Sequence, residues 1–471
     1  MKICLVAEGC YPYTVGGVSS WVHNMIRSFP EHEFVLLAIV SNRAQRGRYV
    51  YELPENLKSV YEVYLEDYDY TDNKKSKKVK LSKKEYDALR SLILNMKVDW
   101  DTIFDLFQKN ISVNNILMGE DFLNIITELY EKNYPEIVFS DFLWTMRSIY
   151  LPMFLILKAD VPEADLYHCV ATGYAGILGA LAKYKYDCGL LISEHGIYTR
   201  EREEEIIKAD WVKGIYKNIW IEQFRKMSQI AYDRADIVTS LFEYARGLQL
   251  ELGCPKEKTV VTPNGINEKL FMDITRKIPE ARYYFDLAAV LRIAQIKDVK
   301  TLINAFSYAL KTKPKMHLWI MGPDDEEEYA QECKEMVKFL NIENNVIFTG
   351  RVDVREYLGK MDCTILTSIS EGQPLTMLEG FAAHLPAIAT DVGNCRGLIY
   401  GENDDFGDAG IITHIMNVEE IKDAIIYMAS NVEKRMEMGE NGYKRLMNNY
   451  RLDQMIERYR DLYNRFDSKE G

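Results

Sequence analysis

The sequence lacks the features that mark disulfide-stapled, zinc-binding and membrane-spanning proteins. Its eight cysteines include no C-x-x-C pair and no zinc-type spacing, so we expect buried, reduced thiols. No uninterrupted apolar stretch approaches the ~18 residues of a typical transmembrane segment. The apolar run 3–7 ends at Glu8 and Gly9 and is too short for a signal-peptide core. We expect a cytoplasmic protein, with the inner face of the membrane as an alternative peripheral location.

An excess of positive charge is also absent. The formal net charge is −13 over 471 residues, whereas sequence-independent binding to nucleic acid depends on Lys and Arg that neutralise phosphates. Nucleic acid is therefore not an expected partner, and any anionic ligand must meet a local positive site. The length exceeds what one hydrophobic core usually organises, which predicts two domains.

Short apolar runs alternate with helix-length segments in both halves of the chain, as in parallel sheets with crossover helices. Pro263-Asn264-Gly265 is a turn-forming tripeptide between the halves. We predict an α/β protein with two doubly wound Rossmann-like domains, residues 1–262 and 263–448, facing across a cleft. Residues 449–471 are predicted to form a helix that packs back toward the first domain. The predicted strands are 3–7, 34–40, 165–170, 190–193, 236–240 and 259–262, then 287–291, 317–321, 345–349, 363–367 and 387–390.

Residues 64–133 form a charged insertion in the first half. A solvated loop is the simpler interpretation of its lysine-rich run, and a docking patch for anionic membrane or a partner is the alternative. Asp67-Tyr68-Asp69 matches a metal-binding D-x-D pattern but does not follow a predicted strand, so we expect no metal there. The acidic run 324–328 is interpreted as the solvated start of a helix. The lysine-rich run contains Lys74, Lys75, Lys77, Lys78, Lys80, Lys83 and Lys84.

The most specific segment follows the predicted strand 363–367 and reads Ser-Glu-Gly-Gln-Pro-Leu-Thr-Met-Leu-Glu-Gly. Pro374 suits a first helical turn, so the amides of Leu375, Thr376 and Met377 are expected to be free for an anion. Glu379 can then accept hydrogen bonds from ribose hydroxyls, which leaves Glu371 for a sugar. Either glutamate alone can simply complement a helix dipole. The intervening Gly372 and Gln373 are assigned to the same donor-binding segment.

Arg292 and Lys297 lie five residues apart in a loop after the predicted strand 287–291. Two such cations can clamp a diphosphate and stabilise charge on a leaving group. Basic loop residues are more often merely solvated, so this pair is a weak signal by itself.

Two further candidates belong to the first half. Gly16 and Gly17 open an amphipathic helix, where backbone and helix N-terminus can approach a phosphate, although a Gly-Gly turn is also common in loops. His195 follows the predicted strand 190–193 and precedes a glycine, a place where ligands approach parallel sheets. A histidine is often structural; here we predict a positioning role rather than proton transfer.

These motifs resemble the retaining GT-B glycosyltransferases of family 4. The resemblance implies that Glu371 contacts the transferred hexose, that Glu379 binds the nucleotide ribose, and that Arg292 and Lys297 bind the diphosphate. It also places Gly17 and its neighbour near the donor phosphates and His195 near the transferred sugar. The family's usual glycine before the arginine is Leu291 here. The resemblance implies no metal and no cofactor besides the UDP-sugar co-substrate.

A narrower resemblance is to the PelF-like glycosyltransferases of Pel exopolysaccharide synthesis. It implies a UDP-sugar donor, UDP-glucose or an N-acetylhexosamine donor, a growing saccharide as acceptor, and membrane-bound Pel synthesis and export proteins as candidate partners. His384 stands where a glycine is usual, and Gly397 where a glutamate is usual. The resemblance is carried by residues 193–199, 167–168 with 172–176, 367–375, 296–301 and 389–393.

The sequence thus predicts front-face sugar transfer with retention, since no second carboxylate is evident as a covalent nucleophile. Two alternatives remain open. One is a UDP-sugar epimerase of the same fold, and the other is a non-catalytic subunit that binds nucleotide sugar within an export complex.

Overall fold

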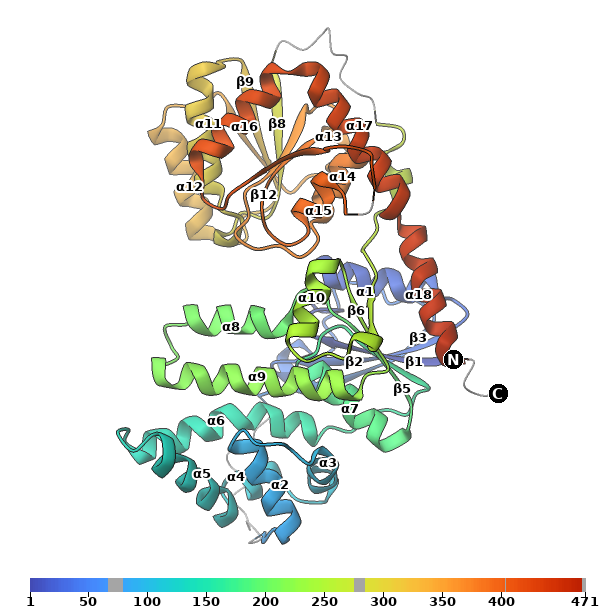
Figure 1. Ribbon diagram of the computed structural model, residues 1–471, viewed down its shortest axis with the longest axis vertical. Coiled ribbons are helices and arrows are strands. Elements are labelled where there is room, and N and C mark those ends of the chain that lie inside the picture. The colour runs from blue at the N-terminus through green and yellow to red at the C-terminus, as the bar shows by residue number, and fades with distance from the viewer. Residues whose placement is uncertain (67–78, 275–283, 403, 468–471) are drawn as a thin grey trace. The chain divides into compact units, whose positions relative to one another are not determined.

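The computed structural model describes residues 1–66, 79–274, 284–402 and 404–467. It divides into two compact units (Figure 1). The first holds the described residues of Met1–Ser240, Arg246–Val261 and Asn464–Gly471, and the second those of Leu241–Ala245 and Thr262–Tyr463. The Asp67-Tyr68-Asp69 segment and the lysines at 74, 75, 77 and 78 fall outside the described residues, so what was predicted for them stays a prediction.

The first unit is built on a seven-stranded parallel sheet in the order β3-β2-β1-β4-β5-β6-β7. Its inner strands are continuous apolar runs because helices cover both faces of such a sheet. Figure 1 shows α1 (Gly17–Ser28) on one side and α7 (Tyr174–Tyr186) with α9 (Gly214–Arg234) on the other. The strands are β1 (Lys2–Glu8), β2 (Glu33–Val40), β3 (Leu57–Tyr64), β4 (Leu166–Cys169), β5 (Gly189–Ser193), β6 (Ile237–Ser240) and β7 (Thr259–Val261).

The described part of the charged insertion is a group of packed helices. Ser82 caps the first of them in a reciprocal capping box with Glu85, which satisfies two free backbone amides. Apolar side chains such as Phe104, Phe122 and Ile126 are buried in the core of the first unit. Of the lysine-rich run, the described Lys80, Lys83 and Lys84 are exposed, and the last two belong to the first turn of α2 rather than to a loop. The helices are α2 (Lys83–Ile93), α3 (Trp100–Gln108), α4 (Val113–Leu117) and α5 (Glu120–Asn133), and α6 (Phe139–Leu157) follows the insertion.

The second unit repeats the plan with a six-stranded parallel sheet in the order β10-β9-β8-β11-β12-β13. The predicted class, two doubly wound α/β units, is confirmed. The strands are β8 (Phe285–Val290), β9 (Met316–Met321), β10 (Val346–Gly350), β11 (Cys363–Leu366), β12 (Ala387–Thr390) and β13 (Gly410–Thr413). The main helices are α11 (Val299–Thr312), α12 (Glu327–Phe339), α14 (Leu375–Ala382), α15 (Cys395–Tyr400), α16 (Val418–Ser430) and α17 (Val432–Asn449).

The last described element is α18 (Leu452–Asp467), whose Phe466 ring packs on Gly189 within the first unit. The eight cysteines are free thiols, seven of them buried, as expected. Within the described ranges, no helix combines the length and apolar character needed to span a bilayer.

Two strands escaped prediction. β3 lies at a sheet edge and mixes Lys58 and Glu62 with apolar residues, so its pattern is not that of a buried strand. β13 has only four residues and begins at Gly410, and a side chain there would collide with the backbone of Ala387. Its strand conformation comes from pairing with β12 rather than from local preference.

Candidate active site

The carboxyl edge of the second sheet brings together the loops that follow β8 and β11. The Thr367 hydroxyl donates to the Lys297 carbonyl at 3.1 Å, and the Ile369 amide donates to the Ile296 carbonyl at 2.9 Å. These bonds hold two segments that are about 70 residues apart in sequence. The predicted donor residues of both loops therefore share one edge, as expected for ligand sites in parallel sheets.

Lys297 and Glu371 form an ion pair in this edge. The Lys297 ammonium donates to Glu371 Oε1, and the Ser368 hydroxyl donates to the same oxygen at 2.6 Å. The two charged side chains are only 17% and 12% exposed, so water screens their attraction weakly. The ion pair holds the Glu371 side chain in place, and it puts a positive and a negative group in direct contact at this edge of the sheet.

Gly393 packs directly against the backbone of the loop that carries Glu371 and Gly372. Its φ is +52°, and a Cβ there would lie 2.2 Å from the Gly372 carbonyl oxygen and 2.3 Å from that of Glu371. The Asn394 amide also donates to the Gly372 carbonyl at 2.9 Å. Only glycine permits this approach, and the backbone bearing Glu371 is held by it.

The first turn of α14 faces the same loop. Leu375 and Thr376 occupy helix positions whose amides have no intrahelical acceptor and remain available to an anion. The prediction for Met377 was wrong, because its amide donates to the Pro374 carbonyl at 3.2 Å in a tight first turn. The Gln373 side chain exchanges two hydrogen bonds of 3.0 Å with the Asn264 backbone, which ties the turn at 263–265 to this loop. Its role in donor binding stays a prediction.

Glu379 lies farther along α14 in a largely desolvated position. Burial, with a smaller contribution from the negative charge of Asp353, raises the pKa of Glu379 to about 7. Since the carboxyl group titrates near 4.5 when exposed, its ionised form is unfavourable in the folded chain without a hydrogen-bonding ligand. Ribose hydroxyls would supply that hydrogen bonding.

Glu379→Gln is expected to weaken uridine binding at pH 8 by about 10-fold, because an amide replaces a charged acceptor of two hydroxyl groups. Uridine affinity of the unaltered chain should fall as the pH drops from 8 to 6, since the carboxylate is protonated in that range. Calorimetric titration with uridine, which carries no phosphate that would titrate, measures both. A pH profile that stays the same in the variant would contradict the assignment.

The same variant should be more stable than the original chain at pH 8. The folded pKa lies above the unfolded value, so the folded state binds more protons between about pH 4.5 and 7 and stability falls as pH rises through that window. Removing the charge is expected to return about 1–3 kcal/mol at pH 8 and little at pH 4.5. Urea unfolding at the two pH values gives the comparison.

Arg292, the second predicted diphosphate ligand, is more exposed and already paired. Its guanidinium donates to Asp325, and the Gln295 amide donates to Glu326 Oε2 at 3.1 Å. The acidic run 324–328 is exposed and leads into α12, as predicted, and it has a second role. Its carboxylates bind the loop that carries Arg292, and an incoming diphosphate would compete with Asp325.

Leu291 does not disturb that loop. Its side chain is buried in the core of the second unit, and the close backbone approach occurs instead at Gly322. A Cβ on Gly322, whose φ is +151°, would lie 1.8 Å from the Leu291 carbonyl oxygen. A glycine that directly follows the neighbouring strand β9 thus permits the close contact beside Leu291.

His384 occupies a left-handed position with φ +55° just after α14, which accounts for the usual glycine. Its ring stacks on Tyr443 at 3.8 Å between centroids, and Nδ1 lies 3.0 Å from Glu440 Oε2. These contacts offset the backbone strain by joining the end of the donor helix to α17. The replacement of the usual glycine by His384 thus affects the packing of α14 on α17.

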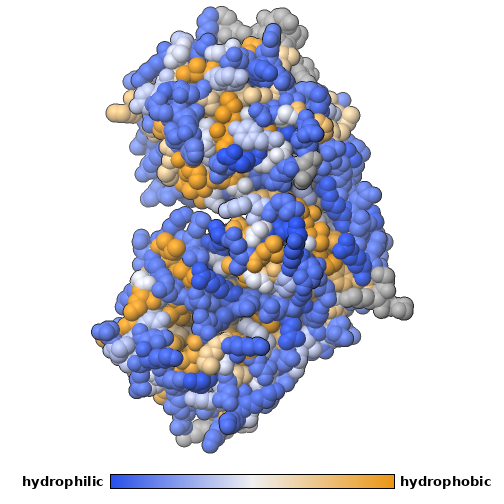
Figure 2. Space-filling view, in the orientation of Figure 1, coloured by the Kyte–Doolittle hydropathy of each residue, from blue (hydrophilic) through white to orange (hydrophobic). Residues whose placement is uncertain are grey.

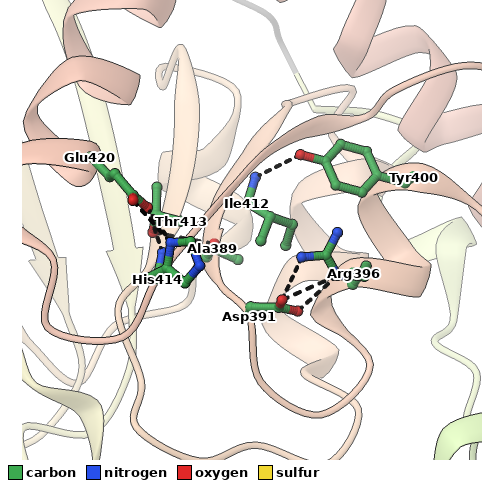
Figure 3. Close-up of polar contacts among 8 residues, drawn as sticks. All are labelled: Ala389, Asp391, Arg396, Tyr400, Ile412, Thr413, His414 and Glu420. Atoms are coloured by element: carbon green, nitrogen blue, oxygen red, sulfur yellow. Dashed lines mark hydrogen bonds and ion pairs between the residues drawn. The ribbon is translucent and has the colours of Figure 1, made fainter.

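The Gly397 departure has a similar explanation. A side chain at this position would meet the Glu402 carboxylate at 2.6 Å, so a neighbouring acidic residue occupies the space. Figure 3 shows the preceding Arg396 forked on Asp391 beside Tyr400, at the carboxyl ends of β12 and β13. The Arg396 side chain is thereby fixed by its ion pair with Asp391.

In the first unit, Gly16 and Gly17 lie at the start of α1, and a Cβ added to either glycine would meet nothing within 4 Å. His195 follows β5, and its ring packs edge-on against Trp21 at 4.5 Å between centroids. Burial lowers the pKa of His195 to about 4, so the ring is neutral near pH 7. Its buried Nε2 has no hydrogen-bond partner among the described residues. A neutral, oriented ring suits the predicted positioning role.

Glu8, at the end of β1, is a candidate that the sequence analysis treated only as the end of an apolar run. It accepts hydrogen bonds from the Tyr198 hydroxyl at 3.2 Å and the Ala175 amide at 3.4 Å. Burial raises its pKa, and the positive charge of Arg202 opposes that rise. The signal was present, since a carboxylate directly after a buried strand lies at the ligand-binding edge.

Two family models match the chain, and together they cover most of it. Residues 1–257 match a Domain of unknown function (DUF3492), and residues 273–445 match Glycosyl transferases group 1. N-acetyl-alpha-D-glucosaminyl L-malate synthase of Bacillus anthracis is 25% identical over 237 residues, which is 49% of this chain and 60% of that protein. Alpha-monoglucosyldiacylglycerol synthase of Streptococcus pneumoniae is 32% identical over 166 residues, 32% of this chain and 37% of that protein. The matches thus span only part of these relatives.

Solved structures share the architecture over nearly the whole chain. Anabaena HepE in complex with UDP and glucose superposes with a TM-score of 0.60 at 14% identity, covering 98% of this chain and 99% of that one. Sucrose-phosphate synthase of Thermosynechococcus elongatus gives 0.62 at 14% identity, covering 99% of each chain. At such identities the likeness establishes the GT-B fold alone. The chain belongs to the DUF3492 family, with a Glycosyl transferases group 1 domain at residues 273–445.

Proposed function

We propose that the chain is a retaining, metal-independent glycosyltransferase that moves a hexose or N-acetylhexosamine from a UDP-sugar to a growing exopolysaccharide. UDP-glucose is the favoured donor, and the PelF-like enzymes of Pel synthesis are the proposed relatives in function. One observation carries the proposal. Lys297 contacts Glu371 at the edge where α14 begins, and Glu379 lies on that same helix.

In the proposed site, Lys297, Arg292 and the amides of Leu375 and Thr376 bind the diphosphate. A bound diphosphate attracts Lys297 away from Glu371, so the carboxylate becomes available to the sugar hydroxyls. Glu379 accepts the ribose hydroxyls. Each of these groups therefore binds a different part of one nucleotide sugar.

Transfer then breaks the bond between the anomeric carbon and the diphosphate oxygen, whose electron pair stays with UDP. The acceptor oxygen bonds to the same face of that carbon, and its proton passes to the departing phosphate oxygen. Lys297 and Arg292 stabilise the charge that develops on the leaving group, and Glu371 stabilises the positive charge on the sugar ring. NMR assignment of the product anomer tests retention; an inverted product would overturn this mechanism.

The donor is identified by measuring thermal stability with a panel of UDP-sugars in the presence of EDTA. The selective donor should raise the melting temperature, since a ligand at 100 times its Kd stabilises the folded state by about 2.7 kcal/mol. Release of UDP should follow when a saccharide acceptor is added. Stabilisation that requires a divalent metal would contradict metal independence.

The same reactions separate two rival functions. An epimerase would convert the UDP-sugar into another sugar nucleotide with no acceptor present, which chromatography detects. A non-catalytic subunit would be stabilised by the donor but would release no UDP with any acceptor. The ion pair of Glu371 and Lys297 supports transfer over simple binding, because in the proposed site it would put charge where the sugar and the diphosphate meet.

A further inference from the structure

Five tyrosines of the first unit gather at the edge of its sheet where ligands bind. They lie in the loop 9–16 after β1, in the loop 41–56 after β2, and at the end of β3. Since these three strands run parallel, their carboxyl ends share one edge. The proposed donor site uses none of these side chains. We call the group the tyrosine cluster, and it consists of Tyr11, Tyr13, Tyr49, Tyr51 and Tyr64.

A backbone hydrogen bond and a ring contact hold the two loops together. The Val50 amide donates to the Pro12 carbonyl at 3.0 Å, and the rings of Tyr13 and Tyr49 meet edge-on with 5.6 Å between centroids. In an edge-on contact one ring presents its edge, so its own two faces stay outside that contact. Tyr49 is 37% exposed. It is therefore held at the surface without being covered.

The other rings of the loops provide the support. Tyr11 is buried, and its ring lies 5.2 Å from that of Tyr51 and 5.8 Å from that of His23 in α1. The Tyr51 hydroxyl lies 3.3 Å from the Ser20 hydroxyl, also in α1. The second loop is thus packed on the first turns of the helix that the glycine turn 16–17 opens. The tyrosine cluster and that glycine turn are neighbours on one edge of the sheet.

Glu62 of β3 anchors the hydroxyl ends of two further rings. It accepts hydrogen bonds from the Tyr13 hydroxyl and, at 2.6 Å, from the Tyr64 hydroxyl. Arg46 Nε lies 3.6 Å from the same carboxylate, whose side chain is only 9% exposed. Rings that are already fixed lose little further freedom when a ligand binds, so this arrangement is organised in advance.

Tyrosine suits a ligand that has both apolar and polar surface. A pyranose ring presents C–H groups on its faces and hydroxyl groups around its rim, so it can stack on a phenol and form hydrogen bonds at the same time. Tyrosine supplies such contact area with only two side-chain torsions to fix. Figure 2 shows a mostly hydrophilic surface on the face in view, with hydrophobic side chains in separate patches. A hydroxyl-rich ligand therefore matches the tyrosine cluster better than it matches those patches.

We propose that the tyrosine cluster binds the acceptor saccharide, with one sugar ring stacked on Tyr49 and with Tyr13, anchored on Glu62, holding that phenol in position. The role of this saccharide as the acceptor rests on the proposed function, whereas its binding does not. A uracil base is the alternative ligand for an exposed phenol, and UDP affinity separates the two.

Calorimetric titration with cellohexaose, maltohexaose and chitohexaose tests the binding. At least one of them should bind the original protein, and Tyr49→Ala should weaken that binding by about 10-fold because the stacked ring is lost. Tyr49→Phe keeps the ring and should bind within about twofold of the original. Tyr184→Ala is the matched control and should bind as the original does. Tyr184 is also 37% exposed, but it lies at the end of α7, which leads to the opposite edge of the sheet.

UDP affinity and transfer kinetics complete the test. UDP affinity should be equal in the original protein and the three variants, and Tyr49→Ala should raise the KM for the acceptor with little change in kcat. Failure of all three hexasaccharides to bind, undiminished binding by Tyr49→Ala, or a loss of UDP affinity in that variant overturns the proposal. Saccharide binding that depends on Tyr49, without transfer from any UDP-sugar, would refute the proposed function and leave the binding site standing. Transfer with an unchanged acceptor KM in Tyr49→Ala would do the reverse.

Discussion

Glu371→Gln is expected to lower the rate of sugar transfer by about 100-fold or more while changing UDP affinity by less than about threefold. The amide keeps the size of the side chain and can still accept a hydrogen bond from Ser368. It loses the negative charge that the proposed mechanism places beside the sugar ring. Initial rates of UDP release with acceptor, and calorimetric titration with UDP, separate the two effects.

The variant should also be less stable, since Lys297 would lose its ionic partner in a position that is only 17% exposed. We expect a loss of about 2 kcal/mol, measured by urea unfolding. Transfer must therefore be assayed at a temperature where both proteins are folded. Glu343→Gln, which neutralises an exposed carboxylate after α12, is the matched control and should leave transfer and stability unchanged. Transfer within threefold of the original in Glu371→Gln would sink the assigned role.

Much of the donor edge could be predicted because its signals are local. A buried strand followed by Glu371, Gly372 and Pro374 is itself a strand-to-helix turn, and the structure places β11 and α14 around it. Lys297 was also assigned to this edge from its place after a predicted strand. Short-range chemistry and the rule that ligands bind at carboxyl ends of strands were sufficient.

The pairing of charges was not predictable in the same way. Arg292 and Asp325 are 33 residues apart, and each follows a different strand of the second sheet. The local pattern indicates only that the acidic run starts a helix. The loop that carries Arg292 comes next to this run only when β8 and β9 pair. The Lys297 contact with Glu371 is likewise a product of the sheet order, in which β8 lies beside β11.

Burial explains why Glu8 was missed. Glu8 ended an apolar run in the sequence, and only the folded sheet shows it enclosed by Tyr198 and the Ala175 amide. Tertiary packing decides this burial, which the local pattern does not encode.

The two cations of the donor edge are expected to contribute unequally. Lys297→Met should weaken UDP affinity by about 100-fold, because a mostly buried ammonium makes stronger charge-assisted hydrogen bonds to phosphate. Arg292→Ala should weaken it by only about 10-fold, since that guanidinium is 60% exposed and shared with Asp325. Asp325→Asn should strengthen UDP binding by about threefold by freeing Arg292. Calorimetric titration at constant ionic strength ranks the three variants.

Misfolding is separated from lost binding by a double variant. Lys297→Met alone leaves Glu371 without its cation, so a weak UDP signal could arise from a disturbed loop. Lys297→Met with Glu371→Gln removes both charges and should recover most of the lost stability. If Lys297 binds the diphosphate, the UDP affinity of the double variant stays about 100-fold below that of the original protein, although no unpaired charge remains in its loop. Recovery of UDP affinity along with stability would show that Lys297 only neutralises Glu371, and the diphosphate would then depend on Arg292 and the amides of α14.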